Sequence, residues 1–201
     1  MEGTACYEPY IFGREVEMNH TTTATTRRPK ILYIDIGPLL LSTSYLSQRP
    51  ELRMVIERSL SLSTAEYLKR IELNPKGVTL LNNFSHQRNI LLYPLGSVFT
   101  REFLVAQGFD SRCLAAEQVV NLRMDDNDMI RKMLSHAYRS NADWRVVGDL
   151  HLNDMELSSK LFTGRYIRTD NINGVTEKLI ESIKVSFDST ATNRVGCQKT
   201  I

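Results

Sequence analysis

The chain has 201 residues, of which 42% are hydrophobic and 24% charged, and its formal net charge is +2. These values are ordinary for a globular protein, and the length suits one domain of moderate size with short tails. The small charge gives no electrostatic reason to expect specific nucleic-acid binding or attraction to an anionic membrane. The sequence contains no run of about 18 apolar residues, so we expect no transmembrane segment.

The cysteines and the N-terminus limit the compartment. The three cysteines, Cys6, Cys113 and Cys197, are odd in number and far apart, so their spacing predicts neither a disulfide framework nor a zinc site. The first twenty residues carry four glutamates and lack an apolar core, which argues against a secretion signal and weakly against a mitochondrial presequence. We therefore expect a cytoplasmic protein, with a mitochondrial location left open.

The composition along the chain predicts three segments. Residues 1–29 are polar and Thr-rich, end in a basic run, and show no hydrophobic period of 2 or 3.6. We expect them to form a flexible N-terminal tail. One α/β domain should follow over residues 30–188, with a C-terminal tail over 189–201.

The first expected strand is the continuous apolar run Ile31–Ile36, which a Gly-Pro pair at 37–38 breaks. Asp35 lies at its C-terminal end. A carboxylate is costly to bury without a partner, so Asp35 should meet a metal, a cation or solvent at the tip of the strand. A small turn and flap over 39–46 and a helix over 51–60 are expected next.

The middle of the chain continues this alternation. A capping box at Ser63–Glu66 predicts a helix that runs to Arg70. The apolar run Val78–Leu81 predicts a second buried strand, with Asn82 at its tip. Helices are expected over 87–95 and over 100–107, where Gly108 ends the second one.

The stretch Arg145–Asp154 has the strongest local signal. A β-branched apolar run reaches Gly148 and Asp149, and a second aspartate, Asp154, follows five residues later. Two carboxylates at such a strand tip suit Mg²⁺, which prefers oxygen ligands. Taken alone, the stretch fits equally well a solvated Asp-rich turn with Asp154 as a helix N-cap. An amphipathic helix from residue 123 precedes it, and a helix over 155–161, a short strand over 166–168 and a helix over 175–183 follow.

Strands that alternate with helices indicate a mainly parallel sheet, and the C-terminal tips of parallel strands meet at one edge. Asp35, Asn82 and Asp149 should therefore lie together. Three polar groups from three strands favour a site for a metal and an anion over a solvated turn.

These residues resemble the motifs of the haloacid dehalogenase-like (HAD) superfamily over roughly residues 29–170. The matching motifs, in order, are the apolar strand with Asp35, the run Val78–Asn82, the cation Arg123, and Gly148-Asp149 with Asp154. The resemblance implies a Rossmannoid three-layer α/β sandwich, and the spacing of the motifs leaves no room for a large cap domain. An uncovered site suits a large phosphorylated substrate or a lid from another subunit.

The resemblance also implies roles. Asp35 would be the nucleophile that forms an aspartyl phosphate, and Asn82 and Arg123 would contact the phosphoryl group. One Mg²⁺ would be held by Asp35, the carbonyl of Gly37 and Asp149, with Asp154 close by.

The sequence departs from the family pattern at three positions. Gly37 stands where the family has the aspartate that acts as general acid, a contribution of about 10² to 10⁴ in rate. Asn82 replaces a hydroxyl residue, and Arg123 replaces a lysine. Three hypotheses follow: a divergent Mg²⁺-dependent phosphatase, a catalytically silent HAD-like binding or regulatory module, and, less well supported, an unrelated Rossmann-like or response-regulator-like domain.

Overall fold

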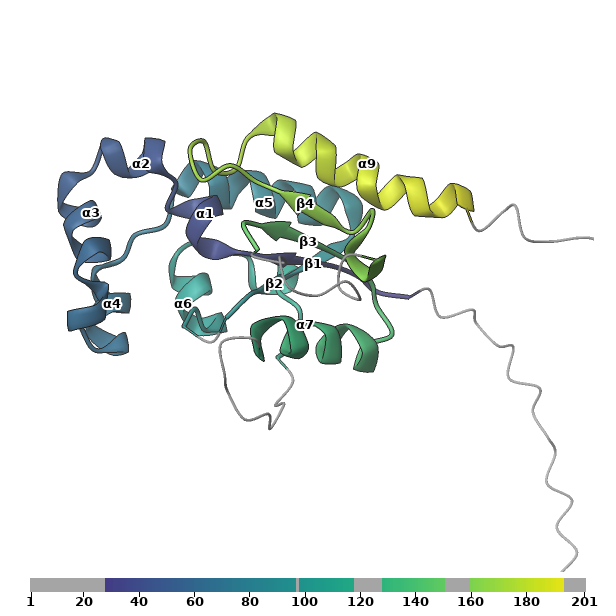
Figure 1. Cartoon of the computed structure of the whole chain (residues 1–201), viewed down its shortest axis with the longest axis horizontal. Coiled ribbons are helices and arrows are strands. Elements are labelled where there is room, and N and C mark those ends of the chain that lie inside the picture. The colour runs from purple at the N-terminus through teal and green to yellow at the C-terminus, as the bar shows by residue number, and fades with distance from the viewer. Residues whose placement is uncertain (1–27, 97, 118–127, 151–159, 194–201) are drawn as a thin grey trace, which may run out of the picture.

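The computed structural model describes residues 28–96, 98–117, 128–150 and 160–193. Its centre is a parallel sheet of four strands in the order β2-β1-β3-β4 (Figure 1). The strands are β1 (Lys30–Ile34), β2 (Ile90–Pro94), β3 (Asp143–Gly148) and β4 (Tyr166–Arg168). The expected α/β class with a parallel sheet is confirmed, as are the strands near residues 31, 145 and 166.

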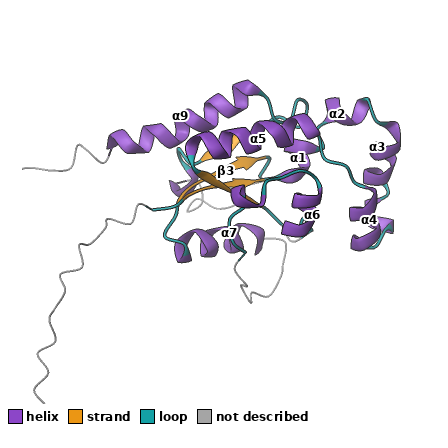
Figure 2. Ribbon diagram, turned by 180° about the vertical axis from the view of Figure 1, so that it is seen from behind, coloured by secondary structure: helices purple, strands orange, loops and turns teal. Residues whose placement is uncertain are grey.

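Helices cover both faces of the sheet, with α5 and α9 on one face and α7 on the other (Figures 1 and 2). The helices are α1 (Ile36–Leu40), α2 (Thr43–Ser47), α3 (Pro50–Glu57), α4 (Thr64–Arg70), α5 (Pro75–Arg88), α6 (Arg101–Ala106), α7 (Asp128–Arg139) and α9 (Glu177–Asn193). Two 3-10 turns, η1 (Ser59–Ser61) and η2 (Ser111–Cys113), lie between them. None of the helices in these ranges is long and apolar enough to cross a membrane.

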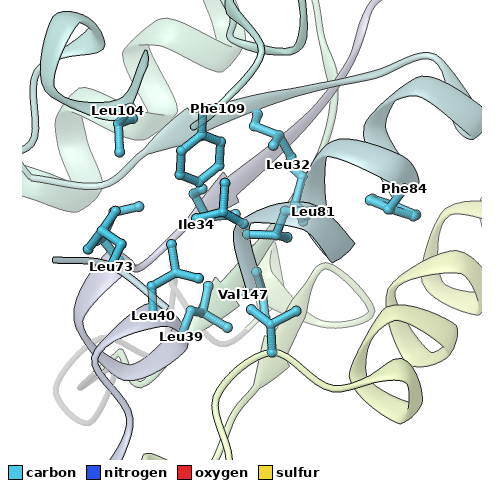
Figure 3. Packing of buried hydrophobic residues seen from close by; sticks show 14 of the residues in the cluster. Leu32, Ile34, Leu39, Leu40, Leu73, Leu81, Phe84, Leu104, Phe109 and Val147 are labelled. Atoms are coloured by element: carbon cyan, nitrogen blue, oxygen red, sulfur yellow. The ribbon is translucent and has the colours of Figure 1, made fainter. Parts of the chain in front are cut away.

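The alternation of side chains along the strands divides the core into two parts. Leu32, Ile34 and Val147 face α5 and α9 and pack with Leu81 and Phe84 (Figure 3). Their neighbours in the strands belong to a second cluster on the side of α7, which contains Ile31, Tyr33, Val146, Met133 and Ala137. A parallel sheet that is covered on both faces explains why its strands read as continuous apolar runs.

The predicted strand at Val78–Leu81 is wrong, because these residues belong to helix α5. Asn74 caps this helix through a hydrogen bond from the N–H of Lys76, and Asn89 ends it in the left-handed conformation with φ of 50°. Short apolar runs fit a buried strand and a buried helix equally well, and here the helical period decides.

The second strand is β2, which occupies residues for which a helix was expected. It pairs with β1 in parallel, with Ile34 opposite Pro94. Pro94 closes the strand at a position where its missing N–H is tolerated, because β2 has a long ladder only with β1.

Two further regions refine the expectations. The flap expected over 39–46 consists of the short helices α1 and α2, which lead into α3 and α4 (Figure 1). The capping box is confirmed: the Ser63 hydroxyl accepts the N–H of Glu66, whose carboxylate accepts the N–H of Ser63. Helix α9 runs past the expected boundary at residue 188 and ends at Asn193.

Candidate functional site

The site with the best structural support lies where the strand order reverses. The chain passes from β1 to β2 on one side of β1, and it later returns to β3 on the other side. In open α/β sheets ligands bind in the crevice outside the carboxyl ends of the strands at such a switch point. Asp35 directly follows β1, and Asp149 directly follows β3.

Backbone hydrogen bonds bring these two aspartates together. The N–H of Asp35 donates to the carbonyl of Val147 at 3.0 Å, which extends the β1–β3 ladder by one residue. The N–H of Asp149 points at the Asp35 carboxylate, with 3.5 Å between its nitrogen and Oδ2. The predicted convergence of Asp35 and Asp149 is thus present.

Gly148 makes this close approach feasible. A Cβ atom at this position would overlap the Cβ of Asp35 and lie 3.1 Å from its Oδ2. A residue without a side chain is therefore required beside Asp35. Packing against Asp35 therefore explains the glycine of the predicted fourth motif, whether or not the chain belongs to the family.

The carboxylate of Asp35 is in an environment that disfavours negative charge. Burial raises its pKa above the ordinary value, and the neighbouring charge of Asp149 raises it further. The backbone N–H groups of Asp149 and Gly37 act in the opposite direction. A cation beside the two carboxylates would offset both unfavourable effects, as in a metal site.

The end of β4 completes the surroundings of Asp149. The amide of Asn171 donates to Asp149 Oδ2 at 3.1 Å, and Nε of Arg168 lies 3.5 Å from Oδ1. The hydroxyl of Tyr166 donates to the carbonyl of Gly148 at 3.1 Å and accepts the N–H of Leu150 at 3.0 Å.

Sequence reasoning missed Tyr166, Arg168 and Asn171. The signal that could have found them was the expected short strand at 166–168, because the tip of a strand beside β3 reaches the same edge of the sheet.

Gly37 lies in α1, where its carbonyl accepts the N–H of Leu41 at 2.9 Å. A carbonyl oxygen has a second lone pair, so its role as a metal ligand stays a prediction. Among the described residues, a Cβ atom on Gly37 would meet only Asp35 Oδ1, at an ordinary contact distance of 3.9 Å. The position where the resemblance would place a general acid therefore has room for a Cβ atom among the described residues.

Asn82 does not lie at a strand tip, which corrects the placement made from the sequence. It lies in α5, where its amide donates to the carbonyl of Gly108 at 2.9 Å and its oxygen accepts the N–H of Asp110 at 3.2 Å. These contacts tie α5 to the loop after α6. Arg123 and Asp154, the other two predicted site residues, lie outside the described residues.

Searches of protein-family models, curated proteins and solved structures found no match to this chain. The functional interpretation therefore depends on the geometry around Asp35 and Asp149.

Proposed function

We propose that the chain is a divergent HAD-like hydrolase that binds Mg²⁺ and acts on a phosphorylated substrate through Asp35. The observation that carries the proposal is the approach of Asp35 and Asp149 at the switch point, with Gly148 between them. Both groups offer the hard oxygen ligands that Mg²⁺ prefers. When bound, the ion would offset the negative charge that the two carboxylates and a phosphoryl group bring together.

In the proposed reaction, a carboxylate oxygen of Asp35 attacks phosphorus while the bond from phosphorus to the leaving oxygen breaks. The leaving group departs with the bonding electron pair as an oxyanion, without protonation by a side chain at position 37. A second water then attacks the phosphorus of the aspartyl phosphate, which releases phosphate and restores Asp35. Asp149 and Asp154 would hold or orient the metal, and Arg123 would contact the phosphoryl group.

The open space at Gly37 determines which substrates suit the site. No side chain there can protonate the leaving oxygen, so the reaction depends on a leaving group that departs without a proton donor. Acyl phosphates and aryl phosphates meet this requirement better than alkyl phosphates. The site should prefer them by a large factor.

The test uses the full chain with acetyl phosphate, p-nitrophenyl phosphate and glycerol phosphate, each with and without Mg²⁺. We expect Mg²⁺-dependent hydrolysis of the first two. Asp35→Asn should abolish it, whereas Asp188→Asn should leave it unchanged, because Asp188 lies in α9 in an exposed ion pair with Arg88. Hydrolysis that survives Asp35→Asn would overturn the assignment of the nucleophile.

The same glycine motivates a second candidate function, a catalytically silent module that binds a ligand at this site. Gly37→Asp distinguishes the two, because the described residues leave room for the Cβ atom of an aspartate at this position. A parent that binds Mg²⁺ without turnover, together with a Gly37→Asp variant that turns over, would favour the silent module. Clear turnover by the parent would exclude it.

A further inference from the structure

A second group of potential metal ligands lies away from Asp35. His86 is in the last turn of α5, Asp110 precedes η2, and Cys113 ends η2. His86 Nε2 lies 3.0 Å from Asp110 Oδ2 and 3.3 Å from Cys113 Sγ. The three ligand atoms are all within 4.8 Å of one another.

The geometry separates a metal site from a catalytic triad. In a Cys-His-Asp triad the thiol and the carboxylate bind different nitrogens of the imidazole, so that the ring can relay a proton. Here both Asp110 and Cys113 approach the same nitrogen, Nε2 of His86. Three electron-pair donors that converge on one point are the arrangement that a cation requires.

We propose that His86, Asp110 and Cys113 bind a divalent transition-metal ion, with Zn²⁺ as the best fit and water as a fourth ligand. Zinc–sulfur and zinc–nitrogen bonds of about 2.3 and 2.0 Å place tetrahedral sulfur and nitrogen ligands about 3.5 Å apart. The corresponding distance here is 3.3 Å. The separation expected for nitrogen and oxygen ligands is about 3.3 Å, against 3.0 Å here. Both pairs that involve His86 therefore need to move by only a few tenths of an ångström, and the third pair, between Asp110 and Cys113, lies within 4.8 Å.

The burial of the three side chains suits a site with one open position. Cys113 is 2% exposed, whereas the side chains of Asp110 and His86 are 23% and 47% exposed. The thiolate would bind the metal from the protein interior and the imidazole from near the surface. Water can then occupy the fourth coordination position, on the side that faces solvent. Thiolate and imidazole select zinc over magnesium, which prefers oxygen alone.

Surrounding contacts hold Asp110 in place. The guanidinium of Arg112 lies against the Asp110 carboxylate, and its Nε donates to Oδ1 at 3.1 Å. Nη2 of Arg112 donates to Asp110 Oδ2 at 2.7 Å, and because the side chain of Arg112 is largely exposed, a metal ion would replace this contact at the protein surface. The amide oxygen of Asn82 accepts a hydrogen bond from the N–H of Asp110 and so fixes the backbone of the loop that carries this ligand.

This site is separate from the one at Asp35. The start of α5 is fixed beside α1 by a hydrogen bond from the N–H of Asn74 to the carbonyl of Leu40. The end of α5, with His86, leads into β2, and Cys113 precedes Leu114, which is bridged to Leu92 in the middle of β2 (Figure 1). The second site therefore lies beside β2, away from the strand tips that carry Asp35 and Asp149. The inference therefore does not depend on the proposed hydrolase activity. A bound ion would fix the end of α5 to η2 and stabilise the fold by linkage.

The test uses the full chain after treatment with a chelator, titrated with Co²⁺ and then with Zn²⁺. Co²⁺ should produce a thiolate-to-cobalt charge-transfer absorption at one equivalent, and Zn²⁺ should abolish it. The double variant Cys6→Ser/Cys197→Ser is the matched control and should retain the band. Cys113→Ser should lose it, and His86→Ala should bind Zn²⁺ at least about a hundredfold more weakly.

His86 is half exposed, so its replacement tests the site without removing a core residue. Circular dichroism should show that His86→Ala keeps its helices. Arg112→Ala should retain the cobalt band with equal or greater affinity. A band that persists in Cys113→Ser, or one that disappears in Cys6→Ser/Cys197→Ser, would overturn the proposal.

Discussion

The two candidate sites occupy different parts of one sheet, the tips of β1 and β3 and the side of β2, and they are built in different ways. Asp35 and Asp149 are placed by the strands that they follow, and they offer carboxylate oxygens at the tips of β1 and β3. His86 and Cys113 belong to a helix and a loop that meet through side-chain contacts, and they offer nitrogen and sulfur. The comparison shows that a site made by strand topology is visible in the sequence, whereas a site made by tertiary contact is not.

The largest expected effect comes from Gly148, where the backbones of the Asp35 site approach most closely. Gly148→Ala forces a Cβ atom against the Cβ of Asp35 in a fully packed region. We expect the free energy of unfolding to fall by about 2 to 3 kcal/mol, the scale of overpacking. Chemical denaturation of the protein, after a chelator has removed any bound metal, measures this change in the free energy of unfolding.

Gly37→Ala is the matched control, since Gly37 flanks Asp35 on its other side but has room for a Cβ atom. Its effect should stay within about 1 kcal/mol of zero, because alanine also favours a helix over glycine. Equal losses in the two variants would show that the contact between Gly148 and Asp35 does not limit packing.

The fold could be predicted from the sequence where a pattern has one physical meaning. The run Ile31–Ile36 and the apolar residues before Gly148 were assigned correctly to strands, because each is a short continuous apolar run that glycine ends, although Ile36 itself begins α1. The run at Val78–Leu81 had two meanings, and the decision for a strand was wrong. The helix caps at Asn74 and Asn89 are what distinguish the alternatives.

The sites follow the same rule. Asp35 and Asp149 could be placed because parallel strands carry their tips to one edge. Asn82 was misplaced together with its strand. The cysteine spacing could not reveal the cluster at Cys113, since two of its three ligands are not cysteines and His86 and Asp110 lie 24 residues apart in the sequence.

Asn82 gives the next largest effect and sharpens the contrast between the two sites. The sequence predicts that Asn82 contacts the phosphoryl group, whereas in the structure its amide bonds to the backbone of Gly108 and Asp110. Asn82→Ala should weaken Zn²⁺ binding by about tenfold, the lower end of the effect of an outer-shell residue, and should leave Mg²⁺ affinity unchanged. Isothermal titration with each ion measures both. Asn83→Ala is the control, because Asn83 is the exposed neighbour in the same turn of α5. A loss of Mg²⁺ affinity in Asn82→Ala would return this residue to the site at Asp35.

The contributions of Asp35 and Asp110 to stability should change with pH in opposite directions. The pKa of Asp35 is raised by burial, so its ionised form reduces stability at neutral pH. Asp35→Asn should raise the free energy of unfolding at pH 7 by about 1 kcal/mol, the scale of a buried polar group without full compensation. The gain should shrink as the pH falls through the folded pKa of Asp35, where the parent carboxyl is protonated as well.

Asp110 has a lowered pKa because of Arg112, so its contribution is present above the unfolded value of about 3.9 and is lost as the pH falls further. Asp110→Asn should therefore lower stability at pH 7, and this loss should begin to shrink only as the pH falls below about 3.9. Thermal unfolding of the chelated proteins between pH 3 and pH 7 compares the two variants. Curves that move in the same direction would contradict the electrostatic difference between the sites.

The smallest expected effect concerns Arg168, whose exposed guanidinium lies 3.5 Å from Asp149 and competes there with a metal. Exposed ion pairs contribute about 0 to 1 kcal/mol, so Arg168→Ala should strengthen Mg²⁺ binding about two- to threefold at low salt, and the effect should fade at high salt. Arg53→Ala, which removes an exposed ion pair with Glu57 in α3, should change nothing. The same titrations with inorganic phosphate test a different role. If Arg168→Ala weakens phosphate binding while Mg²⁺ affinity stays constant, Arg168 acts on the anion, and the phosphoryl contact proposed for Arg123 is shared with the tip of β4.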